Sequence, residues 1–328
     1  MGDVSLRGFF ITGTDTGIGK TVCTCLLARS VAFRSAKGRP FAEQKATLAR
    51  VAAYKPVCSG ATYREGEAPA EPRATSDAHD GYPPSVWPPH PGPLPPSGVP
   101  AECHIECGGE GAELVSGETV PRMGVAGRSR LGGSLALPGS LALPQWSDVE
   151  SLYLATNAAF PRERLCPQTF LAPLSPPAAA ALEGREVDEA LLVAGYHWLA
   201  ERAEMVLVEG AGGFYSPISK DWLNADLAER IGLPVLIVAP NRLGTINQTL
   251  LTIEAVRRRG LTVAGVVLNR INETNDPSTA TNAAEIQDRG RVRIWGEIPF
   301  SPPSELQSSR LPESMVCELR RFGAVVDG

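Results

Sequence analysis

The sequence predicts an α/β fold in which helices cover both faces of a mostly parallel sheet. Three observations predict it. Short, continuously apolar segments such as MVLVE, PVLIVA and TVAGVVLN are typical of strands that are buried on both faces. Segments with helical spacing of apolar residues alternate with them along the chain. Finally, a glycine-rich turn, ITGTDTGIGKT at residues 11–21, separates an apolar strand from a helix.

The elements follow in alternating order. Gly8 to Thr12 (GFFIT) predicts a short buried strand, and the residues after Gly19 predict a helix. Val51 to Val57 (VAAYKPV) predicts the second strand. Further helices are expected at 148–158, 187–202, 225–231, 245–259 and 280–289, and further strands at 205–209, 234–239, 262–269 and 292–298. Ligands of such sheets bind at the carboxyl ends of the strands.

A long insertion interrupts this pattern at about residues 61–145. Residues 81–100 contain nine prolines, and SLALP occurs twice between residues 134 and 144. So many prolines cannot maintain a helix or a central strand, and we expect a disordered segment. The remainder, about 240 residues, suits one domain, so we expect a single domain over residues 1–328. Cys103, His104 and Cys107 could bind a metal, and the prolines could bind a partner domain, but an inert insertion is favoured.

Composition excludes several classes of protein. The chain has 328 residues, 43% of them hydrophobic, which is enough for a sizeable core. A formal net charge of −5 gives no reason to expect nucleic acid or an anionic membrane as partner. The N-terminus lacks a signal-peptide pattern and no apolar run approaches the length of a membrane span. We therefore expect a cytoplasmic protein.

The glycine-rich turn is typical of a phosphate-binding loop, and predicts a P-loop NTPase-like domain. Such a loop presents backbone N–H groups and the positive end of a helix dipole to a phosphate. Lys20 can reach the terminal phosphates, and the hydroxyl of Thr21 can bind Mg²⁺. The spacing departs by one residue from the strict pattern, since Thr14 stands where the first glycine is expected. Nucleotide binding is favoured over a plain chain reversal because a strand and a helix flank the turn.

Glu209 is the candidate acid for this metal ion. It ends the apolar segment MVLVE and precedes the small residues GAGG, at the edge of the sheet that holds the phosphate turn. Mg²⁺ prefers one or two carboxylates together with phosphate oxygens and water. The small residues that follow allow a ligand to approach the backbone closely.

Taken together, these segments resemble dethiobiotin synthetase, an ATP-dependent enzyme family of biotin biosynthesis. The resemblance covers nearly everything outside the insertion. It rests on GTDTGIGKT at 13–21, KPVCSG at 55–60, VEGAGGFYSPIS at 208–219, RLGTINQTLLT at 242–252, GVVLN at 265–269 and GEIP at 296–299. It implies Mg²⁺-dependent carboxylation and ring closure of 7,8-diaminopelargonate with CO₂ and ATP, and a homodimer.

The resemblance also implies roles for individual residues. Lys20 and Lys55 would be catalytic, contacting the transferring phosphoryl group. Thr16 and Ser59 would be hydroxyls on the substrate side, and the start of a helix on the partner subunit would bind the substrate carboxylate through Gly244, Thr245, Ile246 and Asn247. The nucleotide would be bound by Gly17, Ile18, Gly19, Lys20, Thr21, Val22, Asp148, Glu209, Gly210, Ala211, Gly212, Asn269 and Pro299. Gly17 replaces an acid that the family often has.

The family's metal-binding aspartate follows a serine at the start of a helix. Ser147-Asp148 and Ser76-Asp77 both match this pair. Asp148 is favoured because it begins a helical pattern and because its distance to residues 168–170 agrees with the family, whereas HDGYPP follows Asp77. Thr21, Asp148 and Glu209 are thus the predicted metal ligands.

Three alternatives remain open. A partition or septum-site ATPase would carry a signature lysine where this chain has Asp15. A cobyrinic acid amidase would need a glutaminase domain after the ATPase core, and few residues follow Pro299. A nucleotide-binding homologue with impaired catalysis is disfavoured by the presence of Lys20, Lys55 and Glu209.

Overall fold

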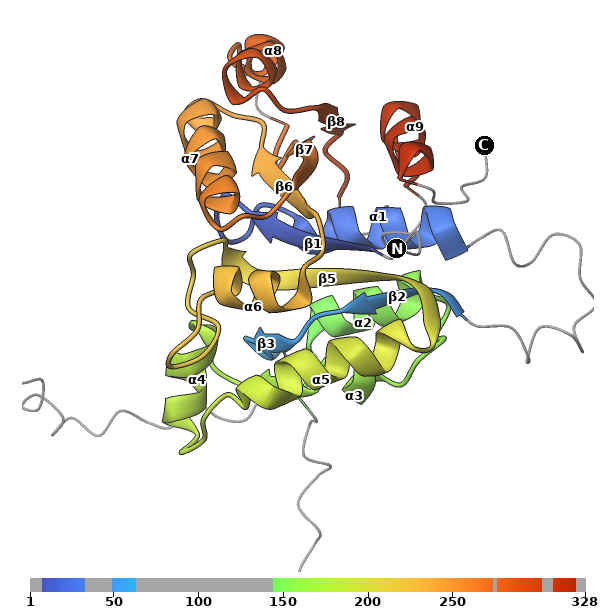
Figure 1. Cartoon of the computed structure of the whole chain (residues 1–328), viewed down its shortest axis with the longest axis vertical. Helices are drawn as coiled ribbons and strands as arrows, with labels where there is room; N and C mark the ends of the chain where they lie inside the picture. Colours follow the sequence, from blue (N-terminus) through green and yellow to red (C-terminus); the bar gives the residue numbers. More distant parts are fainter. Residues whose placement is uncertain (1–7, 33–48, 63–143, 274–275, 303–308, 323–328) are drawn as a thin grey trace, which may run out of the picture. The chain divides into compact units, whose positions relative to one another are not determined.

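The computed structural model describes residues 8–32, 49–62, 144–273, 276–302 and 309–322. Six strands form one parallel sheet in the order β2-β5-β1-β6-β7-β8 (Figure 1). They are β1 (Gly8–Gly13), β2 (Ala49–Tyr54), β5 (Ala203–Gly213), β6 (Val235–Pro240), β7 (Val263–Asn269) and β8 (Ile294–Ile298). The predicted α/β class is confirmed.

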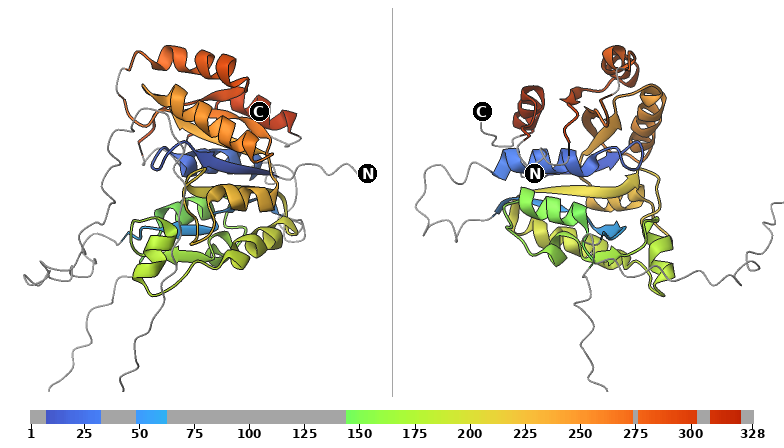
Figure 2. Two further views of the ribbon diagram at one scale, coloured as in Figure 1. Left: turned by 60° about the vertical axis from the view of Figure 1, so that its left-hand side comes forward. Right: turned by 180° about the vertical axis from the view of Figure 1, so that it is seen from behind.

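Helices cover both faces of this sheet, as Figures 1 and 2 show. On one face lie α1 (Lys20–Ala32), α2 (Ser147–Ala155) and α9 (Glu313–Arg321). The other face carries α5 (Glu189–Ala200), α6 (Asn224–Ile231), α7 (Thr245–Arg258) and α8 (Thr279–Gly290). Each side therefore has its own apolar core.

Strand β1 explains why the apolar segments are continuous. Phe9 and Ile11 belong to the core beneath α1, whereas Phe10, which lies between them, belongs to the core beneath α5 to α8. All three side chains are at most 1% exposed. Because side chains alternate across a strand, a strand covered on both faces needs apolar residues at every position.

The predicted second strand at 51–57 is wrong in one respect, since the structure divides it in two. β2 ends at Tyr54, and β3 (Val57–Ser59) pairs instead with β4 (Gln168–Phe170) in a separate two-stranded parallel sheet. Pro56 lies between β2 and β3 and has no N–H to donate to a ladder. The break matters because it places Lys55 at the point where the chain leaves the main sheet.

The helix expected at 148–158 is also shorter than predicted. It ends at Ala155, because Asn157 and Ala158 adopt left-handed conformations with φ of 54° and 53°. The short elements β4, α3 (Arg162–Leu165), α4 (Pro176–Leu182) and α9 were not expected.

The two ends of the expected insertion lie side by side. Thr62 and Gln145 form an antiparallel bridge with backbone hydrogen bonds of 2.7 and 2.9 Å. Residues 63–143, with Asp77 and the candidate ligands Cys103, His104 and Cys107, lie outside the described residues. Over the described part of the chain, no helix is both long enough and apolar enough to cross a membrane.

Candidate functional site

The phosphate turn lies at the carboxyl end of β1, immediately before α1. Gly17 and Gly19 have φ of 71° and 89°, in the left-handed region that favours glycine. A Cβ on Gly19 would lie 2.1 Å from Nδ2 of Asn269. Both the backbone conformation and the lack of space therefore require glycine at residue 19.

The turn is anchored to the body of the sheet. Ile18 is buried, and its carbonyl accepts a 2.8 Å hydrogen bond from Nδ2 of Asn269 at the end of β7. Val22 packs against the core beneath α1. The first backbone N–H groups of α1 have no partners within the helix, so they form an anion-binding end.

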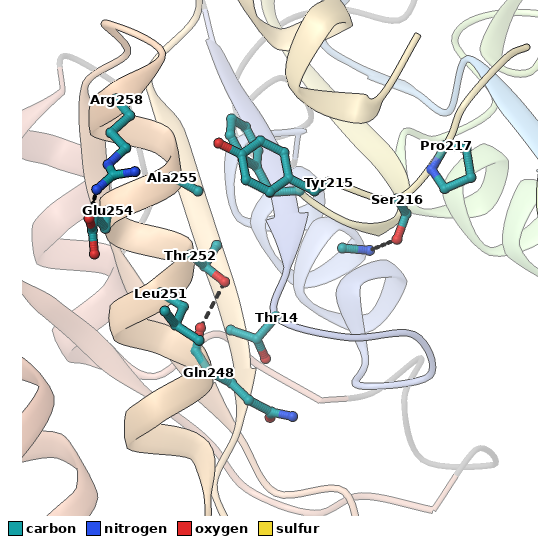
Figure 3. A pocket seen from close by; sticks show the side chains of 12 residues that line it. Thr14, Tyr215, Ser216, Pro217, Gln248, Leu251, Thr252, Glu254, Ala255 and Arg258 are labelled. Atoms are coloured by element: carbon teal, nitrogen blue, oxygen red, sulfur yellow. Dashed lines mark hydrogen bonds and ion pairs between the residues drawn. The ribbon is translucent and has the colours of Figure 1, made fainter. Parts of the chain in front are cut away.

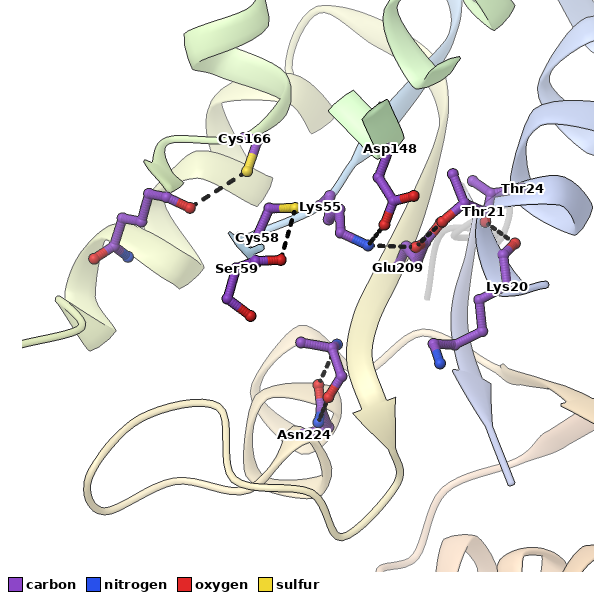
Figure 4. A network of polar contacts seen from close by, with 12 residues as sticks. Lys20, Thr21, Thr24, Lys55, Cys58, Ser59, Asp148, Cys166, Glu209 and Asn224 are labelled. Carbon is purple, nitrogen blue, oxygen red and sulfur yellow. Dashed lines mark hydrogen bonds and ion pairs between the residues drawn. The ribbon is translucent and has the colours of Figure 1, made fainter. Parts of the chain in front are cut away.

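Four polar side chains meet beside this turn, three from α1, α2 and β5 and one from the segment between β2 and β3 (Figure 4). The Lys55 Nζ lies 2.7 Å from Glu209 Oε1 and 2.8 Å from Asp148 Oδ2. Thr21 Oγ1 donates to the same Glu209 Oε1 at 2.7 Å. The side chains of Lys55 and Glu209 are 8% and 0% exposed, whereas that of Asp148 is 42% exposed. The sheet, α1 and α2 thus bring together residues that lie far apart in the sequence.

Electrostatics keep Lys55 and Asp148 charged. Burial lowers the pKa of Lys55, but the carboxylates of Glu209 and Asp148 oppose burial and raise this pKa well above its ordinary value. Burial raises the pKa of Asp148, yet the Lys55 ammonium, together with the hydroxyl of Thr21, brings this pKa below its ordinary value. The pair is therefore an ion pair at neutral pH.

Lys20 lies in the same region but makes a different contact. Its Nζ donates to the backbone carbonyl of Asp15 at 3.0 Å, within its own loop. Burial lowers the pKa of Lys20 to about 8; Glu209 raises this pKa, and the positive charge of Lys55 lowers it further. Lys20 thus remains mostly protonated at neutral pH, as a phosphate-binding lysine must be.

The site fits a hard divalent cation. The second oxygen of Glu209, Oε2, is buried without a hydrogen-bond partner. Among the residues that the structure describes, no group of three or more His, Cys, Asp or Glu side chains gathers to hold a metal ion. A metal held by Glu209, Asp148 and the hydroxyl of Thr21 would need further oxygens from phosphate and water, which is the coordination that Mg²⁺ prefers.

Asn224 is a residue of this region that the sequence did not reveal. It is fully buried at the start of α6. Its Oδ1 accepts from the N–H of Ala211, and its Nδ2 donates to the carbonyls of Ala211, Gly213 and Ser216. A Cβ on Gly210 would lie 2.8 Å from Oδ1 of Asn224, which explains that glycine. Asn224 thereby fixes the loop that follows Glu209, but its only sequence signal is an amide at a helix start.

The two predicted substrate-side hydroxyls belong to Thr16 and Ser59, which lie in different surroundings. The exposed Thr16 donates its backbone N–H to Asp15 Oδ1 at 2.7 Å. Ser59, at the end of β3, donates its hydroxyl to the carbonyl of Leu174. Gly212 has a φ of 83° and lies close to the Thr16 hydroxyl, because a Cβ there would be 3.4 Å from it.

Two further cavities flank the site. Pro299 lies after β8 and lines one of about 670 Å³, together with Arg270, Asn272, Glu297 and Phe300. The other measures about 850 Å³ and lies between the loop after β5 and helix α7 (Figure 3). Its lining includes Thr14, Tyr215, Ser216, Gln248, Leu251 and Thr252.

The start of α7 is not joined to the Lys55 cluster. Gly244, with φ of 90°, precedes the first turn of α7, and the hydroxyl of Thr245 is buried without a partner. Ile246 packs against the core and Asn247 is exposed. In the described regions, no hydrogen bond or ion pair connects residues 244–247 to Lys20, Lys55 or Glu209.

The chain is similar in sequence to known ATP-dependent enzymes. A family model described as an AAA domain matches residues 144–308. The ATP-dependent dethiobiotin synthetase BioD of Anaeromyxobacter dehalogenans (strain 2CP-1) is 50% identical over 156 residues, covering 48% of this chain and 70% of the relative. Its namesake from Aromatoleum aromaticum is 40% identical over 196 residues, covering 57% and 85%.

A solved structure of a ParA family ATPase from Chlorobium tepidum TLS also matches, with a TM-score of 0.40 and 12% identity over 98% of this chain and 94% of its own. A likeness this remote has no bearing on function. The family model spans half of the chain, and the relatives are matched over more than two thirds of their length at 40–50% identity. The chain belongs to the dethiobiotin synthetase family.

Proposed function

We propose that this protein converts 7,8-diaminopelargonate, CO₂ and ATP into dethiobiotin, ADP and phosphate, with Mg²⁺ as cofactor. The relatives named as ATP-dependent dethiobiotin synthetases support the activity. The observation that carries the proposal is the cluster of Lys55, Glu209, Asp148 and Thr21 beside the phosphate turn. Phosphoryl transfer depends mainly on positioning and on neutralising charge, and this cluster offers both.

The reaction proceeds in three steps. One amine of the substrate bonds to CO₂ and loses a proton, which gives a carbamate. A carbamate oxygen then attacks the γ-phosphorus of ATP, and ADP leaves. The second amine attacks the carbonyl carbon of the resulting mixed anhydride and loses a proton, the bond from this carbon to the phosphate oxygen breaks, and the ureido ring closes with release of phosphate.

Each residue has a stated part in this scheme. The backbone N–H groups of residues 17–22 bind the phosphates, and Lys20 leaves the Asp15 carbonyl to contact the γ-phosphate. Lys55 neutralises the carbamate and the transferring phosphoryl group. Thr21, Asp148 and Glu209 would hold Mg²⁺, which when bound neutralises charge on the β- and γ-phosphates.

The nucleotide base and the substrate carboxylate are assigned to the flanking regions. We assign the adenine to Asn269 and to the cavity beside Pro299. The substrate carboxylate binds at residues 244–247 of a second subunit, so the active form is a homodimer. Exposed apolar side chains on and beside α7 support a surface that a partner covers, namely Leu243, Leu251 and Tyr215.

The test is formation of dethiobiotin from diaminopelargonate, bicarbonate and Mg-ATP by the purified protein. We expect activity in the wild type and in Asp77→Ala, and its loss in Lys55→Ala and Asp148→Ala. An inactive wild type, with every reagent verified, would refute the proposed reaction. Loss of activity in Asp77→Ala with activity retained in Asp148→Ala would instead reverse the assignment of the metal ligand.

We also propose that residues 61–145 are a dispensable insertion in a single domain. The bridge between Thr62 and Gln145 supports this, because a short turn can connect two segments whose backbones are already hydrogen-bonded to each other. Replacing residues 63–143 by Asn-Gly should leave the rate of dethiobiotin formation within about twofold of wild type. A soluble, folded deletion variant without activity would show that the segment contributes to function.

The partition-ATPase alternative has less support. Asp15 stands where those proteins carry a lysine, and its carbonyl and carboxylate accept hydrogen bonds from Lys20 and from the backbone of Thr16. The loop therefore has Lys20 but not the second lysine that a partition ATPase carries at the position of Asp15.

A further inference from the structure

The ammonium of Lys55 lies between the same carboxylates that the proposed function gives to the metal. Its Nζ is within 2.8 Å of oxygens from both Glu209 and Asp148. The Glu209 oxygen that it contacts also accepts from Thr21, the third proposed ligand. Glu209 Oε2 has no hydrogen-bond partner and is open to a metal, but a divalent cation held by Glu209, Asp148 and Thr21 together would lie beside the Lys55 ammonium, and the two positive charges would repel each other.

The side chain of Lys55 can move, although its backbone is fixed. Its backbone N–H donates to the carbonyl of Leu165 at 2.8 Å, and Pro56 follows, so the backbone is fixed on both sides. Glu209 is fully buried within β5. Lysine has a long, flexible side chain, and its ammonium can move by several ångströms without any movement of the backbone.

The charges of the cluster favour such an exchange only when phosphate arrives. Glu209 and Asp148 carry two negative charges, and Lys20 and Lys55 carry two positive charges, so the group is neutral. A divalent cation alone would add two positive charges to a mostly buried site, which is unfavourable. A triphosphate brings the missing negative charge and gives the displaced ammonium a new partner.

We propose that Lys55 and the divalent cation compete for Glu209 and Asp148, so that metal binding releases the Lys55 ammonium toward the phosphate and the carbamate. This inference rests on the proposed function of the site. Lys55 then has two roles: it closes the metal site until nucleotide arrives, and it contacts the reacting groups afterwards. Free metal should consequently bind weakly, and nucleotide should bring metal with it.

The experiment measures the binding of Mn²⁺ alone, followed by its paramagnetic resonance signal, to the full-length protein. Lys55→Met retains most of the side-chain volume but removes the ammonium. We expect this variant to bind Mn²⁺ about tenfold or more tightly than wild type, because the competing ammonium is gone. A tenfold change in Kd corresponds to about 1.4 kcal/mol of binding free energy. Lys220→Met is the matched control, because Lys220 is an exposed lysine outside this cluster, and the Mn²⁺ affinity of this variant should differ from that of wild type by less than about threefold.

The outcomes separate this inference from the proposed function. Equal Mn²⁺ affinities in wild type and in folded Lys55→Met, with Mn²⁺ binding enhanced by ATP in both, would overturn the competition and leave the metal site in place. Failure of Mn²⁺ to bind with or without ATP, or binding that survives Glu209→Gln, would overturn the metal site as well. Lys55→Gln is the second variant if Lys55→Met does not fold.

Wild-type protein gives an independent readout. With ¹⁵N-labelled lysine, the Nζ resonance of Lys55 should shift when Mg²⁺ and a non-hydrolysable ATP analogue are added together, and should stay unchanged with Mg²⁺ alone at the same concentration. A resonance that does not respond to the two together would show that the ammonium remains between the carboxylates, and would refute the exchange.

Discussion

The buried amide of Asn224 should be a major determinant of stability near the site. Asn224→Ala removes the acceptor for the N–H of Ala211 and the donor for three carbonyls, at distances of 2.7 to 3.1 Å. The amide nitrogen has only two hydrogens, so the 3.1 Å contact with Gly213 shares one of them. Three full hydrogen bonds at roughly 1 kcal/mol each give an expected loss of about 3 kcal/mol.

Urea denaturation, followed by far-UV circular dichroism, measures this loss as a lower midpoint with an unchanged slope. Because a domain has about 5–15 kcal/mol of stability in total, the variant should still fold at room temperature. Gln287→Ala is the control, since Gln287 is exposed on α8 and its loss should cost less than about 0.5 kcal/mol.

Catalysis should also suffer, because Asn224 holds the loop between Glu209 and Ser216 beside the phosphate turn. The KM for ATP should rise in the folded variant. A loss of less than about 1 kcal/mol, relative to the control, would show that water replaces the amide and that these hydrogen bonds do not determine the stability of the loop.

Two further predictions concern the stability of β7 and α6, which lie outside the Lys55 cluster. Gly265→Ala would place a Cβ 2.2 Å from the indole of the fully buried Trp295. The free energy of unfolding should fall by about 1–3 kcal/mol, which thermal denaturation would show as a lower melting temperature. An unchanged melting temperature would mean that Trp295 can move aside. For Asp226, burial raises the pKa, but the N–H of Leu223 and the guanidinium of Arg259 outweigh it and lower the pKa. A carboxyl with a depressed folded pKa stabilises the fold above its unfolded pKa, and this stability is lost as the pH falls through the folded pKa. Asp226→Asn should therefore be less stable than wild type at pH 7. The difference between the urea midpoints of the two proteins should shrink as the pH falls below 3.8, the ordinary pKa of an aspartate. A difference that does not depend on pH would contradict the assigned hydrogen bonds.

The local elements were largely predictable from the sequence. The strand, turn and helix at residues 8–32 follow from a continuous apolar segment, two glycines and a Gly-Lys-Thr ending. The strands β5, β6 and β7 were expected because strands covered on both faces need uninterrupted apolar residues. Glu209 was chosen because it ends such a segment at the edge of the sheet that holds the phosphate turn, whereas Lys55 was implied by the resemblance to dethiobiotin synthetase.

The partners of these residues depend on the tertiary structure. The sequence did not reveal that β5 lies between β2 and β1, which is what brings Lys55 to Glu209. It left Asp148 and Asp77 in competition, and the contact of Asp148 with Lys55 supports Asp148. The four hydrogen bonds of Asn224 were not visible at all, because an asparagine at a helix start is usual whether or not it is buried.

Apolar periodicity and glycine conformation depend on neighbours within a few residues, so the sequence by itself determined the fold class, the phosphate turn and most strands and helices of this protein. The order of strands, the pairing of β3 with β4 and the position of an ammonium between two carboxylates depend on which faces pack together across the whole chain. Those contacts join residues far apart in the sequence, such as Lys55 with Asp148 and with Glu209, and no local pattern specifies them.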